Sequence, residues 1–217
     1  MSYCPFFIEL ENQAVIIVGG TDAAYQKCRE LVAHGALVTL WAAEFVEDLR
    51  LLKEEQSDNI SILKAELTPD MAEQIFKGKN APLLLVLAGQ DAEYNAELEK
   101  IAEANKVLVN NLSNPESRLN FSANLKRAEI SFAVHAAKAP QLSSAVAQRL
   151  HELFPAHWAQ AYERFMALSQ SEQLALMKPA ERVSELRKLA SALVQADGNI
   201  EDALGLLAGA LEITESE

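Results

Sequence analysis

Hydrophobic residues in the first half of the chain form short continuous runs that alternate with longer amphipathic stretches. The runs are apolar or β-branched throughout, which is typical of strands buried on both faces of a parallel sheet. The expected strands are residues 14–18, 37–41, 60–63, 82–87 and 107–109. The expected helices between them are residues 22–34, 44–55, 68–76 and 91–105. This alternation predicts a Rossmann-type α/β domain with a parallel sheet and right-handed crossovers.

The pattern changes in the second half of the chain. A polar loop at 110–115 is followed by a strand at 130–135, which has no obvious partner in the first sheet, and by a helix at 142–154. From His157 onward every signal is helical, with breaks at Pro179 and at residues 197–199. We expect a boundary near residue 155 between an α/β part and an all-α part.

Charge and cysteine content narrow the function classes. The 217 residues carry a formal net charge of −12, with 31 acidic and 19 basic side chains, which disfavours nucleic-acid and anionic-membrane partners. Apolar runs such as residues 81–88 are too short to span a bilayer, and the N-terminus does not resemble a signal peptide. Cys4 and Cys28 form no zinc-ligand pattern, so no metal site is expected. A disulfide fits their number alone, whereas two reduced thiols fit the cytoplasmic protein that we expect.

The turn after the first strand is the strongest candidate for a cofactor site. Its sequence is Val18-Gly19-Gly20-Thr21-Asp22-Ala23-Ala24, between a strand and a helix, where a dinucleotide fingerprint belongs. Gly19 can make the tight turn and Ala24 can pack close to the strand. Thr21 occupies the position where a second glycine normally lets the backbone approach the pyrophosphate, so we expect weak binding. The alternative is a tight turn that binds nothing.

Other cofactor candidates follow the second and fourth strands. Glu44 lies slightly later than the acid that holds the ribose in dinucleotide-binding domains, and a solvated residue at a helix start is the favoured interpretation of it. The turn after the fourth strand begins at Ala88 and Gly89. The candidate cofactor-binding residues are therefore Gly19, Gly20, Thr21, Asp22, Ala23, Glu44, Ala88 and Gly89.

Several segments, in order and spacing, resemble one family. The opening Tyr3-Cys4-Pro5-Phe6-Phe7-Ile8-Glu9-Leu10 resembles Y-x-P-x-F-x-x-L, and the stretch from Gly19 to Lys27 resembles G-G-G-x-V-A-x-R-K. Residues 34–39 resemble A-G-A-x-V-T, and residues 109–110 resemble the start of V-N-V-V-D, with Pro115 following. Residues 138–140 resemble the end of S-x-G-G-x-S-P. Together these segments resemble precorrin-2 dehydrogenase, the N-terminal module of siroheme synthase.

The resemblance implies three parts and a homodimer. They are a Rossmann-like NAD-binding domain at 1–113, a small α+β dimerisation region at 114–153 and a C-terminal all-α domain at 154–217. It also implies NAD-dependent oxidation of precorrin-2, a tetrapyrrole, to sirohydrochlorin. Some members insert ferrous iron as well, which is sirohydrochlorin ferrochelatase activity.

The positions that the resemblance marks as functional are altered. The aspartate of V-N-V-V-D falls on Ser113, and the neighbouring Asn114 has no carboxylate either, so neither catalytic candidate offers a base of comparable strength. Another acid, such as Asp91 or Glu116, could replace it. The candidates for tetrapyrrole binding are Asn110, His135 and Lys138.

His135 and Lys138 each have a plainer interpretation. A strand-end histidine that is simply hydrogen-bonded is favoured over an iron ligand or proton acceptor, and a solvated lysine is as plausible as one that pairs with a tetrapyrrole carboxylate. Two functions stay open. One is an active, weakly NAD-binding precorrin-2 dehydrogenase. The other is a catalytically degenerate dimeric relative that binds a tetrapyrrole or a partner enzyme of tetrapyrrole biosynthesis. An unrelated nucleotide-binding dehydrogenase is a third, less favoured interpretation.

Overall fold

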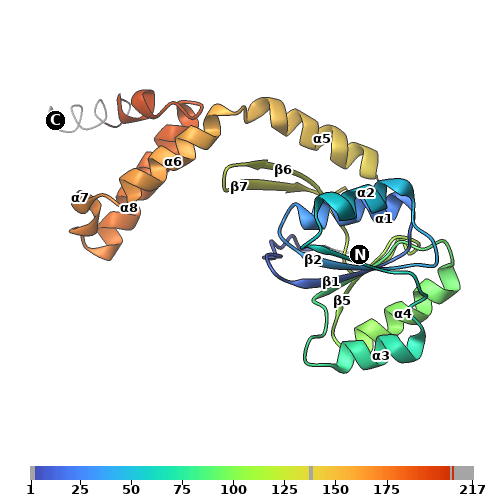
Figure 1. The fold of residues 1–217 in the computed structure, drawn as a ribbon. Coiled ribbons are helices and arrows are strands. Elements are labelled where there is room, and N and C mark those ends of the chain that lie inside the picture. The colour runs from blue at the N-terminus through green and yellow to red at the C-terminus, as the bar shows by residue number, and fades with distance from the viewer. Residues whose placement is uncertain (1–2, 137–138, 206, 208–217) are drawn as a thin grey trace, which may run out of the picture. The chain divides into compact units, whose positions relative to one another are not determined.

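The computed structural model describes residues 3–136, 139–205 and 207, and it divides the chain into two compact units, residues 1–121 and 122–217 (Figure 1). The division into domains at residues 113 and 153 stays a prediction, and each compact unit is described by itself below.

The first unit is built on a five-stranded parallel sheet with the order β3-β2-β1-β4-β5. Its strands are β1 (Ala14–Val18), β2 (Leu37–Trp41), β3 (Ile60–Leu63), β4 (Leu84–Leu87) and β5 (Leu108–Asn111). The chain winds outward from β1 to β3, then returns to the other side of β1 to form β4. The prediction of a Rossmann-type sheet is confirmed, and its topological switch point lies between β1 and β4, where such sheets bind ligands.

Helices cover both faces of this sheet (Figure 1). Helices α1 (Asp22–Val32) and α2 (Glu47–Glu55) pack on one face, and α3 (Pro69–Lys77) and α4 (Ala92–Ala104) pack on the other. Alternate residues of β1 enter the two layers: Val15 and Ile17 join the α1–α2 core, and Ile16 and Val18 join the α3–α4 core. Burial on both faces explains the continuous apolar runs.

Three helices, α1, α2 and α4, are shorter than the sequence pattern predicts, and α4 loses only one residue at each end. Helix α2 begins at Glu47 rather than Glu44, because Phe45 is buried and the Val46 N–H donates to the Gly20 carbonyl oxygen at 2.9 Å. These contacts hold residues 44–46 as a loop against the glycine turn. Helix α1 ends at Val32, and Gly35 follows with a φ of +79°, a conformation that glycine adopts without strain.

The second unit begins with an antiparallel hairpin of β6 (Ala123–Arg127) and β7 (Ile130–Val134). The sequence pattern therefore missed the partner of the strand near residue 130. The two-residue turn places Ala128 at a φ of +48°. Such turns normally carry glycine or asparagine, so an alanine gave no turn signal.

Helices make up most of the remaining described residues of the second unit, as predicted. They are α5 (Pro140–Leu153), α6 (His157–Ser169), α7 (Glu172–Ala175), α8 (Pro179–Gln195) and a helical stretch at 200–205. Buried Trp158, Leu189 and Leu193 form their core. The Phe154 ring joins the hairpin to this core, because it lies 4.5 Å from the Phe132 ring and 5.3 Å from the Trp158 ring.

Candidate functional site

The turn after β1 needs both of its glycines, because the loops after β4 and β2 press against it. Gly19 has a φ of +129°, and a Cβ there would lie 2.7 Å from the carbonyl carbon of Ala88. A Cβ on Gly20 would lie 1.8 Å from the carbonyl oxygen of Glu44. The two glycines therefore bring three loops together at the carboxyl end of the sheet, at its switch point.

Thr21 is the N-cap of α1 and links two of these loops. Its hydroxyl oxygen accepts a hydrogen bond from the Ala24 N–H at 3.4 Å, and its hydroxyl hydrogen is donated to the Ala88 carbonyl oxygen at 3.2 Å. Its backbone is extended, with a φ of −91°, which threonine adopts without strain. The side chain that replaces the usual glycine thus holds the turn, although it adds a methyl group beside it.

The N-terminus of α1 supplies donors for an anion. The first intrahelical hydrogen bond runs from the Tyr25 N–H to the Thr21 carbonyl at 3.0 Å, so the N–H groups of Asp22 and Ala23 have no acceptor within the helix. Such groups at a helix start favour a phosphate. The exposed Asp22 carboxylate adds a negative charge at the same place. The close-packed glycines, the helix N-terminus and the switch point together fit a dinucleotide pyrophosphate.

Glu44 is exposed in the loop between β2 and α2, with its backbone against Gly20. In dinucleotide-binding sheets an acid at the end of the second strand meets the adenosine ribose. The loop from 42 to 46 places Glu44 at that edge of the glycine turn, although three residues later than the strand end.

The turn between β4 and α4 is held by hydrogen bonds. Asp91 caps α4 by accepting from the N–H groups of Glu93 and Tyr94 at 3.0 Å each, so this acid already serves as a helix cap. Asn95 is completely buried, and its side-chain nitrogen donates to the Gly89 carbonyl oxygen at 3.0 Å and to the Ser113 hydroxyl oxygen at 2.7 Å.

The loop after β5 carries Ser113 on its exposed side. The Ser113 N–H donates to the Asn111 side-chain oxygen at 3.0 Å, and the Asn111 amide donates to Glu99 at 2.8 Å. The Asn114 amide lies 3.3 and 3.4 Å from the two Glu99 carboxylate oxygens. Glu116, the other acid considered as a substitute, is exposed in this loop.

Glu99 is the carboxylate that sequence reasoning missed. It is only 9% exposed, and the amides of Asn111 and Asn114 hold it below the loop. One signal was present: Asn95 and Glu99 are four residues apart, so they share one face of α4. This arrangement makes Glu99 an anchor of the loop, because its oxygens are occupied by neutral donors.

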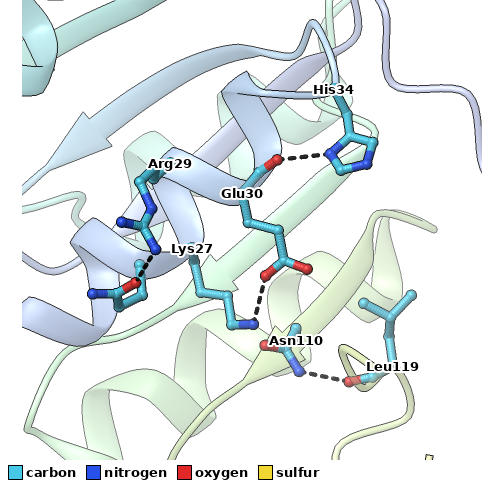
Figure 2. A network of polar contacts seen from close by, with 7 residues as sticks. Lys27, Arg29, Glu30, His34, Asn110 and Leu119 are labelled. Carbon is cyan, nitrogen blue, oxygen red and sulfur yellow. Dashed lines mark hydrogen bonds and ion pairs between the residues drawn. The ribbon is translucent and has the colours of Figure 1, made fainter. Parts of the chain in front are cut away.

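Asn110 precedes Asn111 in β5, so its side chain points to the opposite face of the sheet from that of Asn111. It is hydrogen-bonded to the segment that ends the first unit (Figure 2). Its side-chain nitrogen donates to the Leu119 carbonyl oxygen at 2.7 Å, and the residue is 3% exposed. Nearby in sequence, the Phe121 ring lies 3.9 Å from the Lys27 ammonium, which also pairs with Glu30 at 2.9 Å. Asn110 therefore supports the segment that leads out of the sheet.

The remaining candidates belong to the second unit or cannot be placed. His135 is exposed directly after β7, and Lys138 lies outside the described residues. Of the predicted site residues, the structure gathers Gly19, Gly20, Thr21, Ala88, Gly89, Glu44 and Ser113 at one end of the first sheet. Within the described ranges, no group of three or more His, Cys, Asp or Glu side chains could hold a metal ion.

Comparison with known proteins agrees with this geometry. A family model described as "Putative NAD(P)-binding" matches residues 6–123, more than half of the chain. The chain belongs to this family. The match supports a nicotinamide cofactor, and it covers the sheet, the glycine turn and the Ser113 loop.

Curated relatives include two siroheme synthases. That of Pseudoalteromonas translucida is 31% identical over 160 residues, and that of Tolumonas auensis is 33% identical over 159 residues. Each match covers 72% of this chain and 32% of the relative, so the chain spans about one third of the length of these proteins.

A solved structure titled SirC, precorrin-2 dehydrogenase, shares the fold with a TM-score of 0.68 at 16% identity. The similarity covers 97% of this chain and 100% of that one. These findings confirm the resemblance that the sequence motifs indicated. None of the helices in the described part of the chain combines the length and apolar character that a membrane crossing requires.

Proposed function

We propose that this chain is a precorrin-2 dehydrogenase-like protein of siroheme biosynthesis, which oxidises precorrin-2 to sirohydrochlorin with NAD. The observation that carries the proposal is the glycine turn: Gly19 and Gly20 are locked against Ala88 and Glu44 at the switch point of the sheet. The names of the siroheme synthase relatives and of the SirC structure supply the substrate.

NAD is the proposed cofactor, with weak affinity. When bound, it would accept the hydride that leaves the substrate. The N–H groups of Asp22 and Ala23 would hold the pyrophosphate, and the Glu44 carboxylate would accept hydrogen bonds from the ribose and repel a 2′-phosphate. The Thr21 methyl group and the Asp22 charge both oppose tight binding.

Ser113 and Asn114 occupy the proposed reaction site. The Ser113 hydroxyl oxygen already accepts a hydrogen bond from Asn95, so its hydrogen can be donated to a bound tetrapyrrole. A serine hydroxyl holds a substrate group but is a poor proton acceptor near neutral pH. Turnover and iron insertion should therefore both be slow, since each requires removal of a proton.

Substrate binding is proposed to use charge. A uroporphinoid carries eight carboxylates, so His135 and Lys138 are suited to pair with them. We further propose a homodimer with its interface centred on residues 114–150, and the three-part division at residues 113 and 153.

A second function is favoured by one observation. Among the acids at the carboxyl end of the first sheet, Asp91 caps a helix and Glu99 is buried and held by amides. These contacts argue against Asp91 and Glu99 as substitutes for the missing aspartate, and Glu116, exposed in the loop after β5, stays open as one. A non-catalytic relative that binds a tetrapyrrole or a partner enzyme of the pathway is consistent with this arrangement.

The deciding experiment is anaerobic incubation of precorrin-2 with the purified protein and NAD, followed by absorbance. Formation of sirohydrochlorin that depends on both protein and NAD supports the enzyme. Binding of the tetrapyrrole without conversion, at protein concentrations equal to that of the substrate, supports the non-catalytic relative and contradicts the enzyme.

A further inference from the structure

Asn95 joins the two loops that face the proposed cofactor and substrate. Its side-chain nitrogen is hydrogen-bonded to the carbonyl oxygen of Gly89, in the turn after β4, and to the hydroxyl oxygen of Ser113, in the loop after β5. One buried amide thus bridges segments that are 24 residues apart in the sequence. On the Gly89 side the bridge continues, because the adjacent Ala88 carbonyl accepts the hydroxyl hydrogen of Thr21.

Gly89 fixes the orientation of the Asn95 amide. A carbonyl oxygen can only accept hydrogen bonds, so the amide nitrogen, and not the amide oxygen, must face it. The nitrogen carries two hydrogens, and Gly89 and Ser113 use both of them. The Ser113 oxygen is therefore an acceptor toward Asn95, and its own hydrogen points to another partner. Because Ser113 is exposed, a bound molecule can be that partner.

Stability alone does not account for an asparagine at this position. The side-chain oxygen of Asn95 is buried and has no hydrogen-bond partner among the described residues. A buried acceptor without a partner destabilises the fold, whereas an apolar side chain of similar size would not. Of the two groups that the amide holds, Gly89 is half-buried and Ser113 is exposed. What asparagine provides here is the link between the two loops.

We propose that Asn95 is a positioning residue that couples cofactor binding at the Gly89 turn to the orientation of Ser113. The inference rests on the proposed cofactor site. A dinucleotide that orders the turn after β4 also restrains the loop at 112–117 through the Asn95 amide, and the Ser113 hydroxyl is then presented as a donor to the tetrapyrrole.

The test is amide hydrogen exchange with and without saturating NAD, on the full chain. In the parent, NAD should slow exchange at residues 88–91 and also at 112–117. In Asn95→Leu the slowing should persist at 88–91 and be lost at 112–117, while the Kd for NAD rises by about two- to tenfold, the usual worth of one hydrogen bond. Asn105→Leu is the matched control. That asparagine donates to the Ile101 carbonyl at the far end of the same helix, and its variant should behave as the parent.

Ser113→Ala gives an independent reading, because it removes the acceptor and leaves Asn95 in place. It too should lose the NAD-dependent slowing at 112–117 while keeping it at 88–91. Thermal unfolding separates positioning from support of the fold, since Asn95→Leu should melt no lower than the parent.

Three outcomes overturn the proposal in different ways. The coupling is overturned if NAD slows amide exchange at 112–117 equally in the parent, Asn95→Leu and Ser113→Ala. It is also overturned if NAD slows exchange only at 88–91 in the parent. Either result leaves the proposed NAD site standing. No NAD-dependent change anywhere overturns the proposed cofactor site, and the coupling with it. The third outcome is a large drop in the melting temperature of Asn95→Leu, while Ser113→Ala keeps the parent's NAD-dependent slowing at 112–117. This result shows that Asn95 only supports the fold.

Discussion

The hydroxyl of Thr21 donates a hydrogen bond to the main-chain carbonyl of Ala88, and this bond joins the turn after β1 to the turn after β4. These turns flank the switch point of the sheet. The same hydroxyl caps α1 through the Ala24 N–H. Thr21 therefore has two opposing effects: its oxygen organises the site, and its branched Cβ stands where a phosphate needs a bare backbone.

Replacing Thr21 with glycine should tighten NAD binding. The pyrophosphate could then approach the turn without a side chain in the way, and loss of the cap would cost only a few tenths of a kcal/mol, because glycine is itself a tolerated N-cap. Calorimetric titration of parent and variant measures the difference.

Thr21→Ser is the matched control, because it removes the methyl group and keeps the capping oxygen. Its affinity should lie between those of the parent and the glycine variant. If the parent binds NAD tightly and all three proteins bind it equally, the loop is not impaired by Thr21.

Cys28 should resist thiol reagents in the folded protein. Its side chain is buried, and this burial raises the pKa of the Cys28 thiol from 9.0 to about 12, so the reactive thiolate is suppressed. Cys4 is exposed. A disulfide-exchange reagent at pH 8 should modify one thiol in the native protein and two in denaturant. A Cys4→Ser variant should show none when native, and rapid modification of that variant would contradict the burial.

The raised pKa of the Cys28 thiol also predicts that the folded protein loses stability in alkali. The folded-state pKa lies above the unfolded one, so the contribution of Cys28 is fully present below about pH 9 and disappears as pH rises toward 12. A Cys28→Ala variant should lose less of its unfolding free energy than the parent over this interval. Parallel denaturant titrations at pH 8 and pH 10.5 would reveal the difference.

Association is expected through residues 114–150. The hairpin of β6 and β7 forms a sheet of two strands in the described structure, so each strand has an outer edge that association can cover. Light scattering at high micromolar concentration should report a dimer. Ser131→Asp with Ala133→Asp puts like charges on the exposed side of β7 and should favour the monomer, whereas Ser57→Asp, after α2, should not. A monomeric parent would disprove the interface.

The sequence revealed the first sheet well because its strands are buried on both faces. Three of the five strands have the predicted bounds, and β4 and β5 differ by up to two residues at their ends. Strand β6 was missed because the turn between β6 and β7 contains no glycine or asparagine, the residues that usually indicate a turn. Ala128 adopts the left-handed conformation there instead.

The sequence predicted only those parts of the candidate site where the backbone conformation or a close contact requires a particular residue type. Gly19 and Gly20 stood out because close approach of neighbouring loops requires glycine. Asn95 and Glu99 did not, because polar residues at helical spacing usually mark a solvated face. In α4 they face the sheet instead, and only the partners at Gly89 and Asn111 explain their burial.

Changing Ser113 to aspartate should raise dehydrogenation. Oxidising precorrin-2 removes a hydride and a proton, and a carboxylate beside the ring can accept that proton. General base catalysis of this kind is typically worth about 10² to 10⁴ in rate. The surroundings of residue 113 can stabilise a carboxylate. The Asn95 amide nitrogen lies 2.7 Å from the Ser113 oxygen, and the exposed position avoids desolvation of the charge. Combination with Thr21→Gly should raise activity further, because cofactor affinity would no longer limit the rate.

Two controls decide whether the carboxylate is the cause. In Ser113→Asn the new side chain has nearly the same shape as aspartate but no charge, so this variant should stay as slow as the parent. Ser113→Ala should weaken tetrapyrrole binding, because it removes a hydrogen-bond donor. Anaerobic turnover with NAD, over a range of substrate concentrations, separates the effect on kcat from the effect on KM. Fast turnover by the parent that is insensitive to Ser113→Ala would contradict the prediction and require another base. Absence of turnover in every variant, with tetrapyrrole binding intact, would identify a scaffold that binds the pathway's ligand without transforming it.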